Sequence, residues 1–192
     1  MRLPDEHPLA AVREWLKILI PGIALVAAST AGVIAFQQLN HLRTSTERQQ
    51  RAYVLVTEGA IVNFESGEPK VVLKARNSGQ TPAYKLTVEA NASLGKFPLT
   101  EDLSTIALFK SSSGVVGPGG DYYMTVFMKQ LTSDQRQAIK LGQAAIYLHG
   151  TVRYVDAFGI SRWSTFRCYF GGNTGTPPNG QFSVAEDGND AN

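Results

Sequence analysis

The chain holds little of what disulfide-stabilised, metal-binding and nucleic-acid-binding proteins need. Its one cysteine, Cys168, cannot form an intrachain disulfide. The three histidines, His7, His41 and His149, do not lie at metal-ligand spacing from one another. Charged residues make up 18 % of the chain, and the small net charge of +2 argues against a nucleic-acid partner. We therefore expect no metal site, no cofactor and no nucleic acid.

A catalytic arrangement is also missing from the sequence pattern. Cys168 and His149 fall on neighbouring predicted strands but on opposite faces, so they are not expected to form a nucleophile–base pair. The segment GVVGPGGD is rich in glycine, yet it lacks the Lys-Ser/Thr pair of a phosphate-binding loop and does not lead into a helix. The sequence therefore predicts a protein that is not an enzyme.

One long run lacks charge altogether. Ile18–Phe36 contains 19 residues without a charged side chain, close to the roughly 20 that a helix needs to cross a bilayer. Trp15 and Lys17 stand at its amino edge, where interfacial residues are common. The run predicts a transmembrane helix and its edge over 18–42, with a short amino-terminal arm at 1–17 and a polar helical stalk at 43–51.

Other interpretations of this run stay open. A cleaved signal peptide has a shorter apolar core that ends at a small-x-small site, and VAASTA could serve as that site. A buried core helix would normally be interrupted by a polar face. If the run is an anchor, Arg13 and Lys17 close to its amino edge favour an amino terminus in the cytoplasm, although Arg43 and Arg48 nearly balance them.

Small residues recur within the apolar run. Ala24, Ala28 and Gly32 are spaced by four, so they fall on one side of a helix. Small side chains let two helix backbones approach each other in lipid. This side is a candidate for homo-oligomerisation; the alternative is that alanine and glycine are simply common in membrane spans.

After residue 51 the periodicity changes from helical to alternating, as in strands with one buried face. KVVLKAR places Val71, Leu73 and Ala75 on one face, and AYKLTVEA places Tyr84, Leu86, Val88 and Ala90 together. One helix interrupts the strands over 131–142, with Thr132 as its N-cap and Gln135 completing a capping box.

These patterns predict an all-β fold, an immunoglobulin-like antiparallel sandwich over 52–171 with one short helix. The polar, glycine-rich tail at 172–192 has no usable period and is expected to be disordered. RAYV, NSGQTPAY, the GPGG turn and GTVRYVDAFG followed by STF resemble a group of uncharacterised bacterial proteins with an amino-terminal membrane segment and a soluble β-domain. With the charge argument, the resemblance implies a single-pass protein of the bacterial inner membrane, its β-domain on the periplasmic side.

The register of the last hairpin decides which side chains form its outer face. Pairing Leu148 with Phe166 and Ile146 with Cys168 collects the apolar side chains on the other face. Aromatic and arginine side chains, which are enriched in protein interfaces, then lie together on the outer face: Tyr147, His149, Arg153, Trp163, Arg167 and Tyr169.

We expect this outer face to bind a protein or a cell-envelope partner. One alternative is that a helix or the second sheet covers the face, or that its cross-strand aromatic pairs only stabilise the sheet. A second is that the domain is an accessory ligand-binding domain of a membrane enzyme or transporter system.

Overall fold

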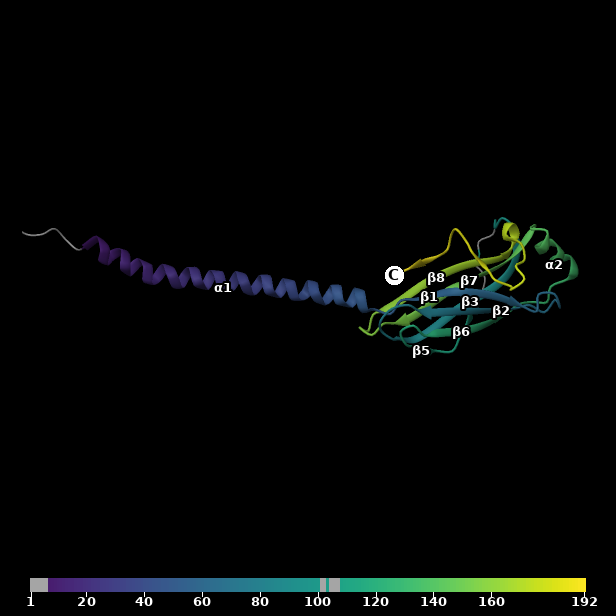
Figure 1. Ribbon diagram of the computed structural model, residues 1–192, viewed down its shortest axis with the longest axis horizontal. Coiled ribbons are helices and arrows are strands. Elements are labelled where there is room, and N and C mark those ends of the chain that lie inside the picture. Colours follow the sequence, from purple (N-terminus) through teal and green to yellow (C-terminus); the bar gives the residue numbers. More distant parts are fainter. Residues whose placement is uncertain (1–6, 101–102, 104–107) are drawn as a thin grey trace, which may run out of the picture. The chain divides into compact units, whose positions relative to one another are not determined.

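The structure, a computed structural model, describes residues 7–100, 103 and 108–192, except for the side chains of 7–12, 14, 18, 20, 21, 24, 26 and 27. The chain divides into two compact units, Met1–Arg48 and Gln49–Asn192. The elements in chain order (Figure 1) are α1 His7–Gln50, β1 Val54–Val62, β2 Lys70–Asn77, β3 Ala83–Lys96, β4 Phe109–Lys110, β5 Gly114–Val116, β6 Asp121–Phe127, α2 Ser133–Lys140, β7 Ala144–Val155, β8 Ser161–Gly171, η2 Gly172–Thr174, β9 Ser183–Val184 and β10 Asp190–Ala191.

Helix α1 contains the uncharged run and continues to Gln50 without a break. In the part of the chain that the structure describes, no helix reaches both the length and the hydropathy of a membrane span. The predicted span therefore stays a prediction. Of the small residues expected to pair two copies, Ala28 and Gly32 are exposed on α1, and the side chain of Ala24 lies outside the described residues.

The β-domain consists of two antiparallel sheets. The smaller sheet has the strand order β1-β2-β6, and the larger has the order β10-β8-β7-β3-β4, with β5 paired to β3 and β9 paired to β8. Buried apolar side chains from both sheets, among them Leu73, Leu86 and Leu148, belong to one core cluster. The domain is thus a β-sandwich with one short α-helix, as the sequence predicts at this level.

The alternation of buried and exposed residues follows the prediction in β2 and most of β3. Val71, Leu73 and Ala75 are fully buried. The start of β3 differs: Tyr84 is 43 % exposed, although it was expected on the buried face, and Ala83 is buried instead. Lys85 adopts a positive φ of 50°, and the pairing of β3 with β7 shifts between Tyr84 and Thr87. This irregularity changes the side on which Tyr84 points.

Helix α2 begins as the sequence predicts. The Thr132 hydroxyl accepts a hydrogen bond from the backbone N–H of Gln135 at 3.2 Å, and the Gln135 side chain accepts one from the Thr132 N–H at 2.9 Å. These two reciprocal bonds are the predicted capping box. Ile139, near the end of the helix, is fully buried in the core.

The pairing of the last hairpin corrects the predicted register by two residues. Leu148 pairs with Cys168 rather than with Phe166, and Ile146 pairs with Phe170. Side chains alternate with a period of two, so a shift of two residues leaves every side chain on its predicted face. The buried and outer sets of this hairpin are therefore those expected from the sequence, although the partners are not.

The prediction of a disordered tail at 172–192 is wrong. The tail forms η2, β9 and β10, and the two strands pair with the edge of β8. Upstream of them, Ile61 donates a backbone hydrogen bond to Gly180 and Phe182 donates one to Gly59. The Phe182 ring is buried 5.8 Å from the ring of Phe170. The buried Phe182 ring and hydrogen bonds to the otherwise unpaired edges of β1 and β8 therefore hold the tail in place, although most of its residues are polar.

Candidate functional site

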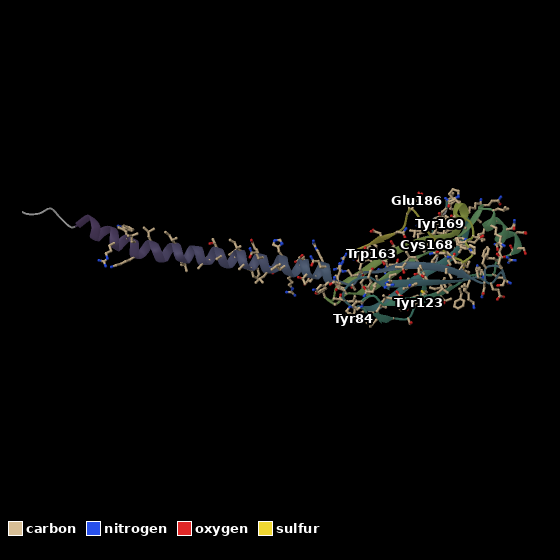
Figure 2. All side chains as sticks on the ribbon, viewed as in Figure 1. Tyr84, Tyr123, Trp163, Cys168, Tyr169 and Glu186 are labelled. Atoms are coloured by element: carbon tan, nitrogen blue, oxygen red, sulfur yellow. The ribbon has the colours of Figure 1, made fainter. Side chains whose placement is uncertain are left out.

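The six residues predicted for partner binding all lie on the outer face of the β7–β8 hairpin. Three cross-strand pairs connect them: Tyr147 with Tyr169, His149 with Arg167, and Arg153 with Trp163. Thr151 and Thr165 form a fourth pair between the last two. We call these four pairs the β7–β8 outer face; Figure 2 labels Trp163 and Tyr169, two of its members on β8.

One end of the β7–β8 outer face is covered. Tyr147 is 3 % exposed and His149 is 9 % exposed. The Tyr147 hydroxyl donates a hydrogen bond to the carbonyl of Lys96 at 3.0 Å, and the ring of Phe97 lies 5.5 Å from that of Tyr169. The connection that follows β3 covers this end of the face, whereas the alternative named a helix or the second sheet as the cover.

The other end of the face is open. The side chain of Arg153 is 59 % exposed and lies 3.7 Å from the carboxylate of Glu89. Trp163, opposite Arg153, is half-buried, and its backbone N–H donates to the side chain of Asn192 at 2.8 Å. A partner can reach these two side chains without any movement of the sheet.

The carboxy-terminal segment passes over β8 at Arg167. The backbone N–H of Arg167 donates to the Asn189 side chain at 2.9 Å, and its carbonyl accepts from the N–H of Ala185 at 3.0 Å. Gly188 lies against the guanidinium group, since a Cβ added there would be 2.8 Å from Arg167 Nε. Gly188 also has a positive φ of 86°, so a larger residue at this position would be strained and would displace the Arg167 side chain.

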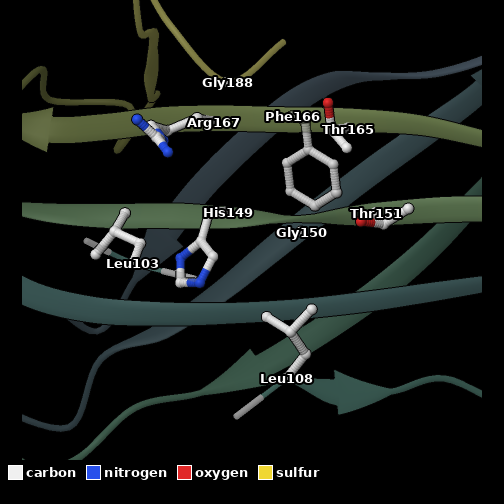
Figure 3. A pocket seen from close by; sticks show the side chains of 9 residues that line it. All are labelled: Leu103, Leu108, His149, Gly150, Thr151, Thr165, Phe166, Arg167 and Gly188. Atoms are coloured by element: carbon white, nitrogen blue, oxygen red, sulfur yellow. The ribbon is translucent and has the colours of Figure 1, made fainter. Parts of the chain in front are cut away.

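A cavity of about 280 Å³ opens between the covered and open ends. In Figure 3 the His149 side chain lies beside Leu103, and the Arg167 side chain, on the neighbouring strand, lies beside the segment that holds Gly188. The lining combines apolar side chains with hydroxyl, imidazole and guanidinium groups: Leu103, Leu108, His149, Gly150, Thr151, Thr165, Phe166, Arg167 and Gly188.

Two nitrogen-bearing side chains of this cavity have unused hydrogen-bonding groups. Among the described residues, neither ring nitrogen of His149 has a well-aligned partner, and Nε of Arg167 is likewise unpaired. Burial lowers the pKa of His149 from its ordinary value of 6.5, the charge of Arg167 lowers it further, and the backbone of Leu103 opposes part of the shift. His149 is therefore a neutral imidazole at pH 7, with one donor and one acceptor.

Nucleophilic chemistry finds no support in this arrangement. Cys168 pairs with Leu148 and faces the core, so its thiol lies on the opposite side of the sheet from His149. Burial raises the pKa of the Cys168 thiol to about 11, which keeps it protonated and unreactive at pH 7. In the described ranges, no three His, Cys, Asp or Glu residues are grouped closely enough to hold a metal ion.

Sequence patterns did not indicate the residues that close the cavity. Leu103 and Leu108 come from the connection between β3 and β4, and Gly188 comes from the tail. Loops have no regular spacing of apolar residues, so their contacts with the sheet cannot be inferred from the sequence. The one available signal was the apolar pair in QFSV, followed by a DG turn, within an otherwise polar tail.

Comparison with known proteins gives a family but no activity. A family model described as a domain of unknown function, DUF8453, matches residues 15–170. No curated protein and no solved structure matches the chain. The matched range includes most of α1 and the sandwich through β8, so the chain belongs to the DUF8453 family.

Proposed function

We propose that this chain is a non-catalytic, single-pass protein of the bacterial inner membrane whose immunoglobulin-like β-sandwich binds a protein or cell-envelope partner on the periplasmic side. The observation that supports binding is the β7–β8 outer face. It joins an accessible Arg153–Trp163 pair to a cavity where His149 and Arg167 have unused hydrogen-bonding groups. Buried polar groups in folded proteins are nearly always paired, so unpaired ones beside a cavity favour a ligand that is absent from the structure.

Anchoring is supported by the composition and exposure of α1. The helix has no distinct polar face along its length, and its uncharged run lies well inside it. Ile23, Leu25 and Phe36 are each 65–70 % exposed in the structure. A helix that is apolar on all sides is stable only when protein or lipid surrounds it. A bilayer would supply that environment.

A second function is favoured by the cavity itself. The domain could serve as the ligand-binding part of a membrane enzyme or transporter system, because the cavity is large enough for a small molecule and its polar groups converge from two strands. A partner protein inserting a side chain and a free small molecule would use the same cavity. Native mass spectrometry of the purified full chain separates the two, because only the second predicts a bound small molecule.

Membrane fractionation tests the anchor. The full chain is expected to stay with the membrane pellet after alkaline carbonate and high-salt washes, because apolar burial rather than charge would hold it there. Ala28→Asp, in the middle of the uncharged run, should disfavour insertion by about 2.5–3.5 kcal/mol and move a large fraction to the supernatant. Ala28→Val, which stays apolar, is the matched control.

Two results would contradict this anchor. Release of the wild-type chain by carbonate would show that α1 does not enter the bilayer. Recovery of a shortened, soluble species that starts near Ala31 would show that the run is a cleaved signal peptide.

A further inference from the structure

The cavity on the β7–β8 outer face is lined by two nitrogen-bearing side chains, His149 and Arg167, whose hydrogen-bonding capacity is not fully used by the described residues. His149 is more than nine-tenths buried, its ring lines the cavity, and its one close polar neighbour, the backbone of Leu103 in the described part of the chain, is not aligned for a regular hydrogen bond. Arg167, its cross-strand partner, makes no ion pair with any carboxylate in the described part of the chain. Glu186 and Asp187 line the neighbouring cavity together with Arg167, yet neither comes within ion-pair distance. A permanent positive charge and a buried imidazole thus line the same cavity.

The lining selects the chemistry of a ligand. A cation is disfavoured because the guanidinium of Arg167 is always charged. A dianion is disfavoured as well, since one permanent charge would face two negative ones while His149 is neutral and two acidic side chains stand next to Arg167. A single carboxylate matches the planar guanidinium and can also accept from the imidazole and from the hydroxyl of Thr151.

We propose that this cavity binds a carboxylate group that carries a short apolar substituent. The carboxylate would lie between Arg167 and His149, and the substituent would contact Leu103 and Leu108, which line the same cavity. The inference rests on the proposed binding function and names the chemical group that is recognised. The cavity volume of about 280 Å³ suits a small acid or the terminal residue of a peptide rather than a larger ligand.

Nuclear magnetic resonance of the full chain in detergent micelles tests the site, with histidine rings labelled with ¹³C. His149 is the one histidine of the β-domain, so His7 and His41 in α1 serve as internal references. Titration with isobutyrate should shift the His149 ring signal in a saturable way and leave the other two unchanged. Isobutyramide, which has the same shape without the charge, should produce no saturable shift. An equal response to isobutyramide, or none to isobutyrate, would overturn the proposal.

Substitution of Arg167 tests the assigned charge. Arg167→Gln should weaken isobutyrate binding at least tenfold, and Arg167→Lys should give an intermediate affinity because it keeps the charge but loses the planar fork. Arg76→Gln, on the other sheet, is the control for a change in net charge and should bind as the wild type does. Unchanged binding by Arg167→Gln would contradict the proposal. If Arg167→Gln does not fold, the affinity of Arg167→Lys and the comparison of isobutyrate with isobutyramide test whether the charge of Arg167 binds the carboxylate.

The source of the carboxylate is distinguished with a peptide. Tighter binding of acetyl-Ala-Val than of isobutyrate, together with loss of binding for its carboxy-terminal amide, assigns the carboxylate to the end of a partner chain. Equal or weaker binding of the peptide assigns it to a small acid. Both results support the site. If isobutyrate does not bind, the results of membrane fractionation and of partner crosslinking are not affected. A wrong carboxylate site can therefore be distinguished from a wrong proposed function.

Discussion

Replacing Asn77 with alanine is expected to destabilise the β-domain by about 3 kcal/mol or more. Asn77 is fully buried, and its side-chain amide donates to the carbonyls of Thr81 at 2.8 Å and Val116 at 3.1 Å. Its side-chain carbonyl accepts from the backbone N–H groups of Tyr53 at 3.1 Å and Gly79 at 3.0 Å. Alanine leaves all four backbone groups without this partner, and each buried unsatisfied group costs roughly 1–3 kcal/mol.

Asn77→Asp separates hydrogen bonding from packing. Aspartate has the same shape and keeps both accepted bonds, but its second oxygen faces the carbonyls of Thr81 and Val116 instead of donating to them. It should therefore also destabilise the domain by several kcal/mol at pH 7. Urea denaturation, followed by Trp163 fluorescence in a Trp15→Phe background, gives the free energies of unfolding. Loss of less than about 1 kcal/mol in Asn77→Ala would show that these bonds do not stabilise the fold.

Replacing Phe166 with alanine should cost roughly 3–5 kcal/mol of stability. The Phe166 ring is 5 % exposed and belongs to the main core cluster. Its ring packs against the main chain at Gly150, where an added Cβ would lie 2.8 Å from Cζ, and glycine has no side chain that could fill the space that alanine leaves. Urea denaturation followed by far-ultraviolet circular dichroism measures this effect, because that signal does not depend on Trp163 and so also serves the Trp163→Ala variant.

Trp163→Ala is the matched comparison on the same strand. Trp163 is half-buried on the outer face and opposite Arg153, so its loss should cost about 1 kcal/mol, the value of a cross-strand pair. The reverse order of the two effects, with Trp163→Ala unfolded and Phe166→Ala tolerated, would mean that the two faces of the hairpin are exchanged.

The faces of the strands could be predicted from the sequence because burial follows a period of two. Leu148, Phe166 and Cys168 are apolar and belong together in any register that differs by an even number of residues. The alternation alone could not distinguish Phe166 from Cys168 as the partner of Leu148. That choice depends on the loop at 156–160, in which Asp156 accepts from the backbone of Phe158 and Ile160.

The covering of the binding face could not be predicted from the sequence. Tyr147 and His149 were expected to be accessible, but Leu103 and the tail at Gly188 come from segments without periodicity and pack there through tertiary contacts. The position of Tyr84 was missed for a related reason, because the irregularity at Lys85 has no signature in an alternating pattern. The six predicted residues were therefore placed on the correct face, while the cavity between them became visible only in the structure.

Site-specific photocrosslinking of the full chain in cells of its native host tests the binding face most directly. A benzophenone side chain at Arg153 on the outer face is compared with one at Tyr123, which is 61 % exposed on the other sheet. We predict one light-dependent adduct of discrete mass from position 153 that is lost when Trp163→Ala is added, and none from position 123. Adducts from position 123 but not from 153, or an adduct at 153 that persists in Trp163→Ala, would contradict binding through this face.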